Sequence, residues 1–137
     1  MKGRFESKVK DERELNLLQL EGLKWTVGHA YKGSSFYRNK LDEKGVKPKD
    51  IMSLEDIRKL PFTTARDLQD GYPFPLLSVP MSKVVRIHAS SGTTGKRKVL
   101  CYTKKDIDDW ASMMARCFHY AGCTTKDRVQ IAVGYGV

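Results

Sequence analysis

The sequence predicts an α/β fold in which a helical N-terminal portion precedes strands. The first observation is an apolar stripe at helical spacing, formed by Leu17, Leu20, Leu23, Val27 and Tyr31. The second is a change of period after residue 80, where short runs rich in β-branched residues replace that spacing. The third is the length of 137 residues, which suits one domain or a part of a larger one.

The N-terminal portion is expected to contain several helices. Gly33, Ser34 and Ser35 interrupt the first one, and residues 36–41 continue in a second helix that ends before a turn at residues 45–48.

Two shorter helices should follow, each opened by a capping box, in which a hydroxyl and a carboxylate three residues later bond to the backbone. Ser53 with Asp56, and Thr64 with Asp67, occupy these positions, and Pro61 ends the first of the two helices. A connector rich in glycine and proline then runs to residue 80.

The second portion begins with two strand-like runs, residues 84–88 and 99–102, which flank a small polar segment at residues 89–97. Thr103 and Asp106 form a further capping box that opens a helix. We therefore divide the chain into residues 1–80, a helical portion with its connector, and residues 81–137, the incomplete start of an α/β domain.

The last helix is expected to bury one face in the core. Its stripe consists of Ile107, Trp110, Met114 and Phe118. Lys104 and Lys105 should form its solvated start, and Gly122 should end it. Residues 128–133 then predict a last strand.

Composition excludes several classes of protein. The formal net charge of +9 is spread evenly, with 14 basic and 10 acidic residues in 1–60 and 11 and 6 in 61–137, which is a poor basis for specific nucleic-acid binding. No apolar run approaches the roughly 20 residues of a membrane helix, and the first residues do not resemble a secretory signal. We expect a cytoplasmic protein without nucleic-acid or membrane partners.

The cysteines, Cys101, Cys117 and Cys123, do not have the spacing of a disulfide framework or a zinc ribbon. Cys117, His119 and Cys123 lack a clear fourth ligand, and the helical pattern instead predicts Cys117 as a small buried apolar residue. We expect no metal site.

The glycine-rich segment carries the chemical information. It consists of Ser90, Ser91, Gly92, Thr93, Thr94, Gly95 and Lys96. Glycines let the main chain approach a ligand closely, while hydroxyls and successive N–H groups donate to phosphate oxygens. Lys96 adds a positive charge, so the segment is suited to hold a polyphosphate.

This segment is not a Walker A loop, because it lacks the first glycine and is followed by Arg97 instead of serine or threonine. It also joins two strand-like runs instead of a strand and a helix. Residue composition alone leaves a flexible hairpin loop as an equal alternative.

A family resemblance favours the phosphate loop. The segment, followed by Lys98, resembles the signature of the adenylate-forming superfamily, and its surroundings are similar to the phenylacetate–CoA ligase family. The matching blocks, from about residue 13 onward, include residues 36–38, 53–57, 60–64, 72–74, 86–89, 102–103, 106–107, 110, 115–116 and 134–136.

The resemblance implies the large mixed-sheet N-terminal domain of an adenylate-forming enzyme, and a two-step reaction. An aryl carboxylate attacks the α-phosphate of ATP to give an acyl-adenylate and pyrophosphate, with Mg²⁺ neutralising the phosphates, and the thiol of coenzyme A then displaces AMP. Residues 90–96 would bind the ATP phosphates, and Tyr135 with Gly136 would border the acyl pocket. The resemblance also favours a homodimer, whereas the N-terminal stripe could equally cover the main domain.

The sequence differs from the pattern of the family in two respects. Arg97 stands where the family usually has a small residue, and the adenine-binding and C-terminal parts of the family cannot be located in the sequence. We therefore expect an N-terminal fragment that is inactive in isolation, the alternative being a nucleotide- or partner-binding module without catalysis. His88 is expected to be a strand residue outside the site.

Overall fold

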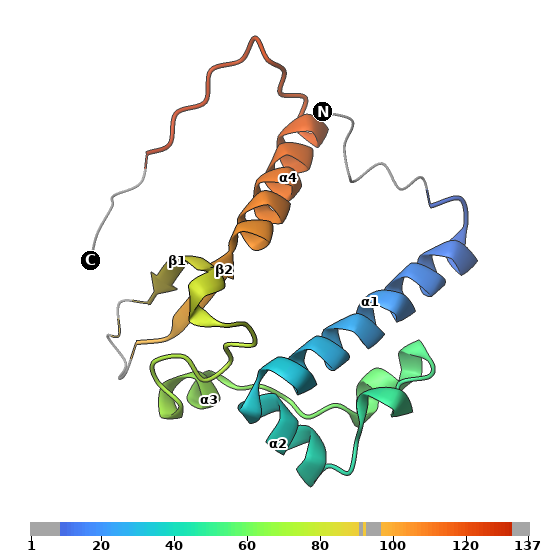
Figure 1. Cartoon of the computed structure of the whole chain (residues 1–137). Helices are drawn as coiled ribbons and strands as arrows, with labels where there is room; N and C mark the ends of the chain where they lie inside the picture. Colours follow the sequence, from blue (N-terminus) through green and yellow to red (C-terminus); the bar gives the residue numbers. More distant parts are fainter. Residues whose placement is uncertain (1–8, 91, 93–96, 133–137) are drawn as a thin grey trace.

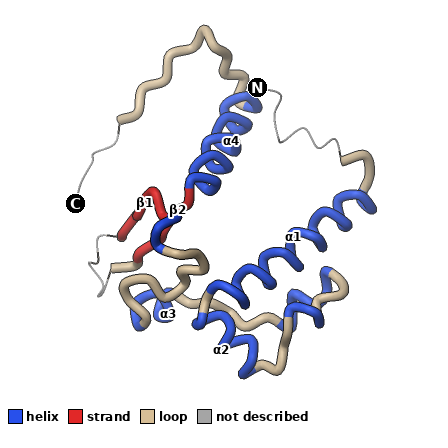
Figure 2. The backbone as a smooth tube through the Cα atoms, in the orientation of Figure 1, coloured by secondary structure: helices blue, strands red, loops and turns tan. Residues whose placement is uncertain are grey.

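A computed structural model describes residues 9–90, 92 and 97–132 of the chain (Figure 1). The α-helices are α1 (Glu12–Gly33), α2 (Ser35–Glu43), α3 (Ala65–Asp70) and α4 (Lys104–Tyr120). Short 3-10 helices occupy η1 (Pro48–Asp50), η2 (Leu54–Lys59) and η3 (Met81–Lys83), and the strands are β1 (Val84–Ala89) and β2 (Val99–Thr103). The predicted α/β class is confirmed as a mixture of helices and a small antiparallel sheet. Figure 2 shows where the helices and the strands lie along the chain.

The helical portion is built around α1, which packs against α2, η1 and η2. Four apolar side chains are buried between these elements: Val27, Leu41, Val46 and Ile51. Leu20, Leu23 and Tyr31 pack against this cluster, so most of the predicted stripe faces the core of the helical portion. Leu17 is the exception, since 56% of its surface is exposed.

The predicted interruption between the first two helices lies at Ser34. This residue has an extended backbone (φ −120°), and its N–H donates to the Ala30 carbonyl oxygen at 3.0 Å. Its hydroxyl accepts from the N–H of Tyr37 at 3.4 Å, which caps α2. Ser34 is almost completely buried, so one small polar residue both ends α1 and starts α2.

All three predicted capping boxes form. The backbone N–H groups of Ser53, Thr64 and Thr103 donate to the carboxylates of Asp56, Asp67 and Asp106 at 2.7–2.8 Å. The segment after Ser53 is a 3-10 helix and not an α-helix, in keeping with its six residues.

The connector crosses the end of α1 at close range. A Cβ atom added to Gly33 would lie 2.0 Å from the Ser78 carbonyl oxygen, so only glycine leaves room for the connector. The Ser78 hydroxyl lies 2.9 Å from Nε2 of His29, one turn earlier on α1. These contacts hold the connector against the helical portion.

The strands β1 and β2 form an antiparallel hairpin, with Ala89 opposite Val99 and Ile87 opposite Cys101. The register is irregular between Val84 and Arg86. Helix α4 follows β2 directly and packs against it.

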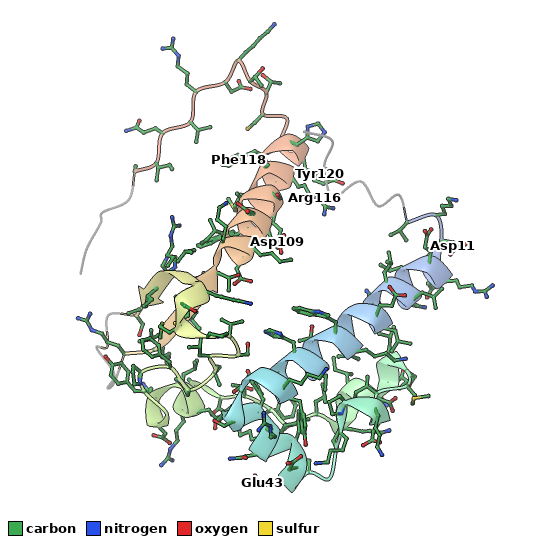
Figure 3. The ribbon with its side chains drawn as sticks, viewed as in Figure 1. Asp11, Glu43, Asp109, Arg116, Phe118 and Tyr120 are labelled. Carbon is green, nitrogen blue, oxygen red and sulfur yellow. The ribbon has the colours of Figure 1, made fainter. Side chains whose placement is uncertain are left out.

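The expected burial of the α4 stripe is wrong. Trp110, Met114 and Phe118 keep 41–44% of their surface exposed, and Cys117, expected to be buried, is exposed as well. The physical reason is that β2 is the main packing partner of α4 among the described elements, and it reaches only the start of the helix. Figure 3 shows Phe118 at the end of α4 farthest from the hairpin. Lys104 and Lys105 are solvated as predicted and pair with Asp108 and Asp109.

The predicted strand at residues 128–133 is also not observed over its described part, residues 128–132. Val129 and Ile131 are 60% and 76% exposed. A strand needs a neighbour that pairs with its backbone groups, and the described hairpin does not pair with this segment.

Candidate functional site

The described residues include part of the predicted site. Ser90 and Gly92 of the glycine-rich segment are described, whereas Ser91, Thr93, Thr94, Gly95 and Lys96 lie outside the described residues. The candidate acyl-pocket residues Tyr135 and Gly136 also lie outside them.

The segment lies between the two strands of the hairpin, as the sequence predicted. The last paired residues are Ala89 and Val99, so the segment connects adjacent antiparallel strands. A P-loop NTPase places its phosphate loop between a strand and a helix. The described structure therefore supports the distinction from a Walker A loop.

Two residues close the base of this loop, which we call the neck. The N–H of Ser90 donates to the Lys98 carbonyl oxygen at 3.0 Å, and the N–H of Lys98 donates to the Ser90 hydroxyl oxygen at 3.0 Å. Two residues further, Gly92 has a φ of +77°, a left-handed conformation that favours glycine. One of the predicted glycines thus has a backbone conformation that residues with side chains rarely adopt.

An aromatic cluster lies behind the neck. The His88 ring is 5.0 Å from the Tyr102 ring and 5.7 Å from the Trp110 ring, and the Tyr102 and Trp110 rings stack at 5.7 Å. These residues come from β1, β2 and α4, so the cluster joins the hairpin to the helix. His88 is a strand residue, as expected, but its aromatic contacts were missed, because residues 88 and 102 become neighbours only when the strands pair.

A groove of about 720 Å³ separates the hairpin from the helical portion. Its lining is mainly apolar and includes Trp25, His29, Phe74, Cys101, Trp110 and Met113. Trp25 and His29 stack almost in parallel, 4.9 Å apart. Sequence reasoning did not identify this groove, because its walls come from segments far apart along the chain.

The thiol of Cys101 lies in the lining of this groove and is partly buried. Burial raises the pKa of the Cys101 thiol above its ordinary value, which disfavours the thiolate that acts as a nucleophile. Among the residues that the structure describes, no cluster of three or more His, Cys, Asp or Glu side chains is arranged to hold a metal ion.

The fold is similar to that of solved CoA ligases. It matches 2-hydroxyisobutyryl-CoA ligase in the postadenylation state with 2-HIB-AMP at a TM-score of 0.76 and 26% identity, covering 84% of this chain and 25% of the other. A structure of that ligase with 2-HIB-AMP and CoA in the thioesterification state gives a TM-score of 0.69 and 29% identity, covering 79% and 24%. The described fold is therefore that of a segment of an adenylate-forming CoA ligase.

Comparison with curated sequences shows which CoA ligases this chain is similar to in sequence. The chain is 53% identical to phenylacetate-coenzyme A ligase of Escherichia coli, 54% to that of Aromatoleum evansii and 47% to that of Thermus thermophilus. Each match covers 124 residues, or 90% of this chain and 28% of the relative. The predicted resemblance is confirmed: the chain is a relative of phenylacetate–CoA ligases and spans about 28% of their length. No protein-family model matches it.

The long helices give no sign of a membrane span. None of the helices in the described ranges combines the length and the apolar character that crossing a bilayer requires.

Proposed function

We propose that this chain supplies the ATP phosphate loop of an aryl-acid CoA ligase. In such an enzyme a phenylacetate-like carboxylate attacks the α-phosphate of ATP, which forms an acyl-adenylate and releases pyrophosphate, and the thiol of coenzyme A then takes the acyl group and releases AMP. The observation that carries the proposal is the identity of 47–54% to phenylacetate–CoA ligases over 87–90% of the chain. A match of 124 residues in a chain of 137 necessarily includes residues 14–124, and therefore the loop.

Within this proposal, residues 90–96 surround the β- and γ-phosphates of ATP. Their hydroxyl and N–H groups donate to phosphate oxygens, and the Lys96 ammonium neutralises charge. Hydrogen bonds to a charged partner contribute roughly 1.5–3 kcal/mol each. Tyr135 and Gly136 border the aryl group of the acid.

The loop also fits the Mg²⁺ that accompanies ATP. Magnesium is held largely by substrate phosphates and water, and needs few protein oxygen ligands. The Ser90 hydroxyl oxygen already accepts from the Lys98 N–H, so phosphates and water would supply most of the ligands, and the described residues contain no competing cluster of three or more His, Cys, Asp or Glu side chains. When bound, Mg²⁺ neutralises phosphate charge during adenylation.

The remaining parts of the proposal concern the whole protein. Residues 1–80 act as a helical portion with its connector, and residues 81–137 begin the nucleotide-binding α/β domain. The ligase works in the cytoplasm as a homodimer. The exposed apolar stripe of α4 favours a part of a larger ligase over a stand-alone binding module, because an isolated module is expected to cover such a surface.

Calorimetric titration of the 137-residue chain with Mg-ATP, pyrophosphate and adenosine tests the phosphate loop. We expect ATP and pyrophosphate to bind and adenosine not to, and Lys96→Ala to weaken ATP binding at least tenfold, equivalent to about 1.4 kcal/mol. Lys105→Ala is the matched control, because its ammonium pairs with Asp109 on α4, outside the loop. Equal binding of ATP by the Lys96→Ala chain and the unaltered chain would remove Lys96 from its role, and no binding of ATP or pyrophosphate by the unaltered chain would contradict the phosphate loop.

The ligase reaction is tested in a relative. The matching segment of the Escherichia coli enzyme is replaced by this chain, and pyrophosphate exchange is compared with thioester formation from a supplied acyl-adenylate. We expect Lys96→Ala to slow the exchange more than the thioester step. A chimera that folds but forms no phenylacetyl-CoA would contradict the assignment.

A further inference from the structure

Ser90 lies where the hydrogen-bond ladder of the hairpin ends. In a regular antiparallel pair, two opposite residues exchange both N–H···O=C bonds. The N–H of Ser90 does donate to the Lys98 carbonyl oxygen, at 3.0 Å. The return bond is different: the N–H of Lys98 donates to the Ser90 hydroxyl oxygen, also at 3.0 Å. A side chain thus replaces a main-chain acceptor at the last rung.

This substitution has a geometric consequence. Because the hydroxyl oxygen takes the place of the Ser90 carbonyl, the two strands can diverge immediately after this rung without leaving the Lys98 N–H unpaired. Residues 91–97 are the segment between the two neck residues. The two hydrogen bonds therefore hold Ser90 and Lys98, the ends of the loop, at a fixed separation. Gly92, two residues after Ser90, has a left-handed φ of +77°.

The neck is also supported from behind. His88 precedes Ser90 by two residues on β1, and its ring contacts Tyr102 of β2 and Trp110 of α4. The cluster fixes β1 and β2 to each other and to α4 just before the ladder ends. Ser90 is therefore both the last residue of a hairpin that the aromatic cluster holds against α4 and the first residue of the loop.

We propose that Ser90 is a positioning residue for phosphate binding: its hydroxyl binds the backbone N–H of Lys98 and so sets the opening of the loop. The inference rests on the proposed function, and it changes the role of one residue within it. Ser90 acts through Lys98, whereas Ser91 to Lys96 remain the groups that contact phosphate.

The test compares two variants at residue 98. Lys98→Ala keeps the backbone N–H and removes the ammonium, whereas Lys98→Pro removes both. In the Lys98→Ala chain, adding Ser90→Ala should weaken Mg-ATP binding about 3- to 10-fold, the effect of one lost hydrogen bond. In the Lys98→Pro chain, the same change should have less than a twofold effect, because the partner N–H is already absent.

Two further variants complete the experiment. Ser90→Thr keeps the hydroxyl oxygen and should restore binding to within twofold of the unaltered chain. Ser112→Ala is the control, because that hydroxyl donates to the Asp108 carbonyl within α4 and should not affect ATP. If Ser90→Ala weakens binding equally on both residue-98 backgrounds, the hydroxyl contacts phosphate directly and the inference is wrong.

Amide hydrogen exchange of the nucleotide-free chain separates this inference from the proposed function. The Lys98 amide should exchange more slowly in the unaltered chain and in Ser90→Thr than in Ser90→Ala. If the Lys98 amide exchanges at the same rate in Ser90→Ala as in the unaltered chain, the hydrogen bond to the Ser90 hydroxyl is contradicted. This result decides the question even if Lys98→Pro fails to fold. If the unaltered chain does not bind ATP, the proposed function fails and the positioning role with it, while the exchange rates still decide whether the neck exists.

Discussion

The Nζ atom of Lys40 lies 2.9 Å from the Oδ2 atom of Asp67 and joins α2 to α3 across 27 positions of the sequence. The same ammonium donates to the Phe62 carbonyl oxygen at 3.0 Å, so it also holds the segment that leads into α3. Asp67 in turn accepts from the backbone N–H of Thr64 at 2.7 Å. One ion pair therefore combines a helix cap with a tertiary contact.

This arrangement predicts a pH dependence of stability. The Thr64 N–H, the Lys40 ammonium and the Thr64 hydroxyl together lower the pKa of Asp67 from 3.8 to about 2. A carboxylate with a lowered folded-state pKa stabilises the fold above its unfolded pKa, and this stabilisation is lost as the pH falls through the folded value. We expect stability to decline between about pH 4 and pH 2.

Urea unfolding of Asp67→Asn across this range measures the effect. The variant should be less stable than the unaltered chain at pH 7 and should lose less stability on acidification. Asp70→Asn serves as the control, because Asp70 pairs with the exposed Arg66 within α3 and makes no tertiary ion pair among the described residues. Parallel pH profiles for Asp67→Asn and the unaltered chain would contradict the prediction.

A second prediction concerns the crossing of α1 and the connector. Gly33→Ala places a methyl group 2.0 Å from the Ser78 carbonyl oxygen, a distance at which the backbone must shift. We expect a loss of about 1–3 kcal/mol in the free energy of unfolding, as for other overpacked sites. Thermal unfolding followed by circular dichroism measures it.

Gly28→Ala in the same helix is the matched control. An added Cβ at Gly28 meets no atom within 4 Å, so alanine should stabilise α1 by roughly 0.5–1 kcal/mol. Opposite signs for the two substitutions are the expected result. An increase in the free energy of unfolding of Gly33→Ala would show that the connector does not lie in close contact with α1.

A third prediction concerns the aromatic cluster behind the neck. Trp110→Leu keeps an apolar side chain and loses the stacking on Tyr102 and the edge contact with His88. We expect the free energy of unfolding to fall by about 1–2 kcal/mol. Trp110→Phe retains an aromatic ring and should lose less. Equal losses in chemical unfolding of the two variants would show that apolar area, and not ring stacking, holds α4 to the hairpin.

A fourth prediction concerns thiol reactivity. The Cys101 thiol is partly buried on β2 and its pKa is raised, whereas Cys117 is exposed on α4. Because the thiolate is the reactive form, Cys117 should be alkylated several times faster than Cys101 at pH 8. Mass spectrometry of peptides after timed iodoacetamide treatment gives both rates from one sample. Faster labelling of Cys101 would show that β2 does not bury it.

The features predicted correctly from the sequence are those set by nearby residues. Capping boxes at Ser53, Thr64 and Thr103 depend on a carboxylate three positions away, and the break at Ser34 depends on small polar residues. Motif spacing also sufficed to recognise the resemblance to phenylacetate–CoA ligases. These predictions do not depend on which elements of the fold pack against each other.

The errors and omissions concern contacts between distant residues. Periodicity shows that α4 has an apolar stripe, but it does not say whether another element covers Trp110 and Phe118. Alternation at residues 128–132 shows strand propensity, but a strand also needs a partner. The contact between His29 and Ser78 joins positions 49 residues apart, so the groove became visible only once the chain was folded.

The tryptophans have a practical consequence. The chain contains two, and both line the same groove, Trp25 from α1 and Trp110 from α4. Intrinsic fluorescence of the unmodified chain therefore reports on this groove. Trp25 is already 65% exposed and Trp110 42%, so a shift of the emission to longer wavelength when the hairpin and the helical portion separate comes mainly from Trp110. The protein thus contains a natural optical probe of how its two portions are held together, and no added dye is needed.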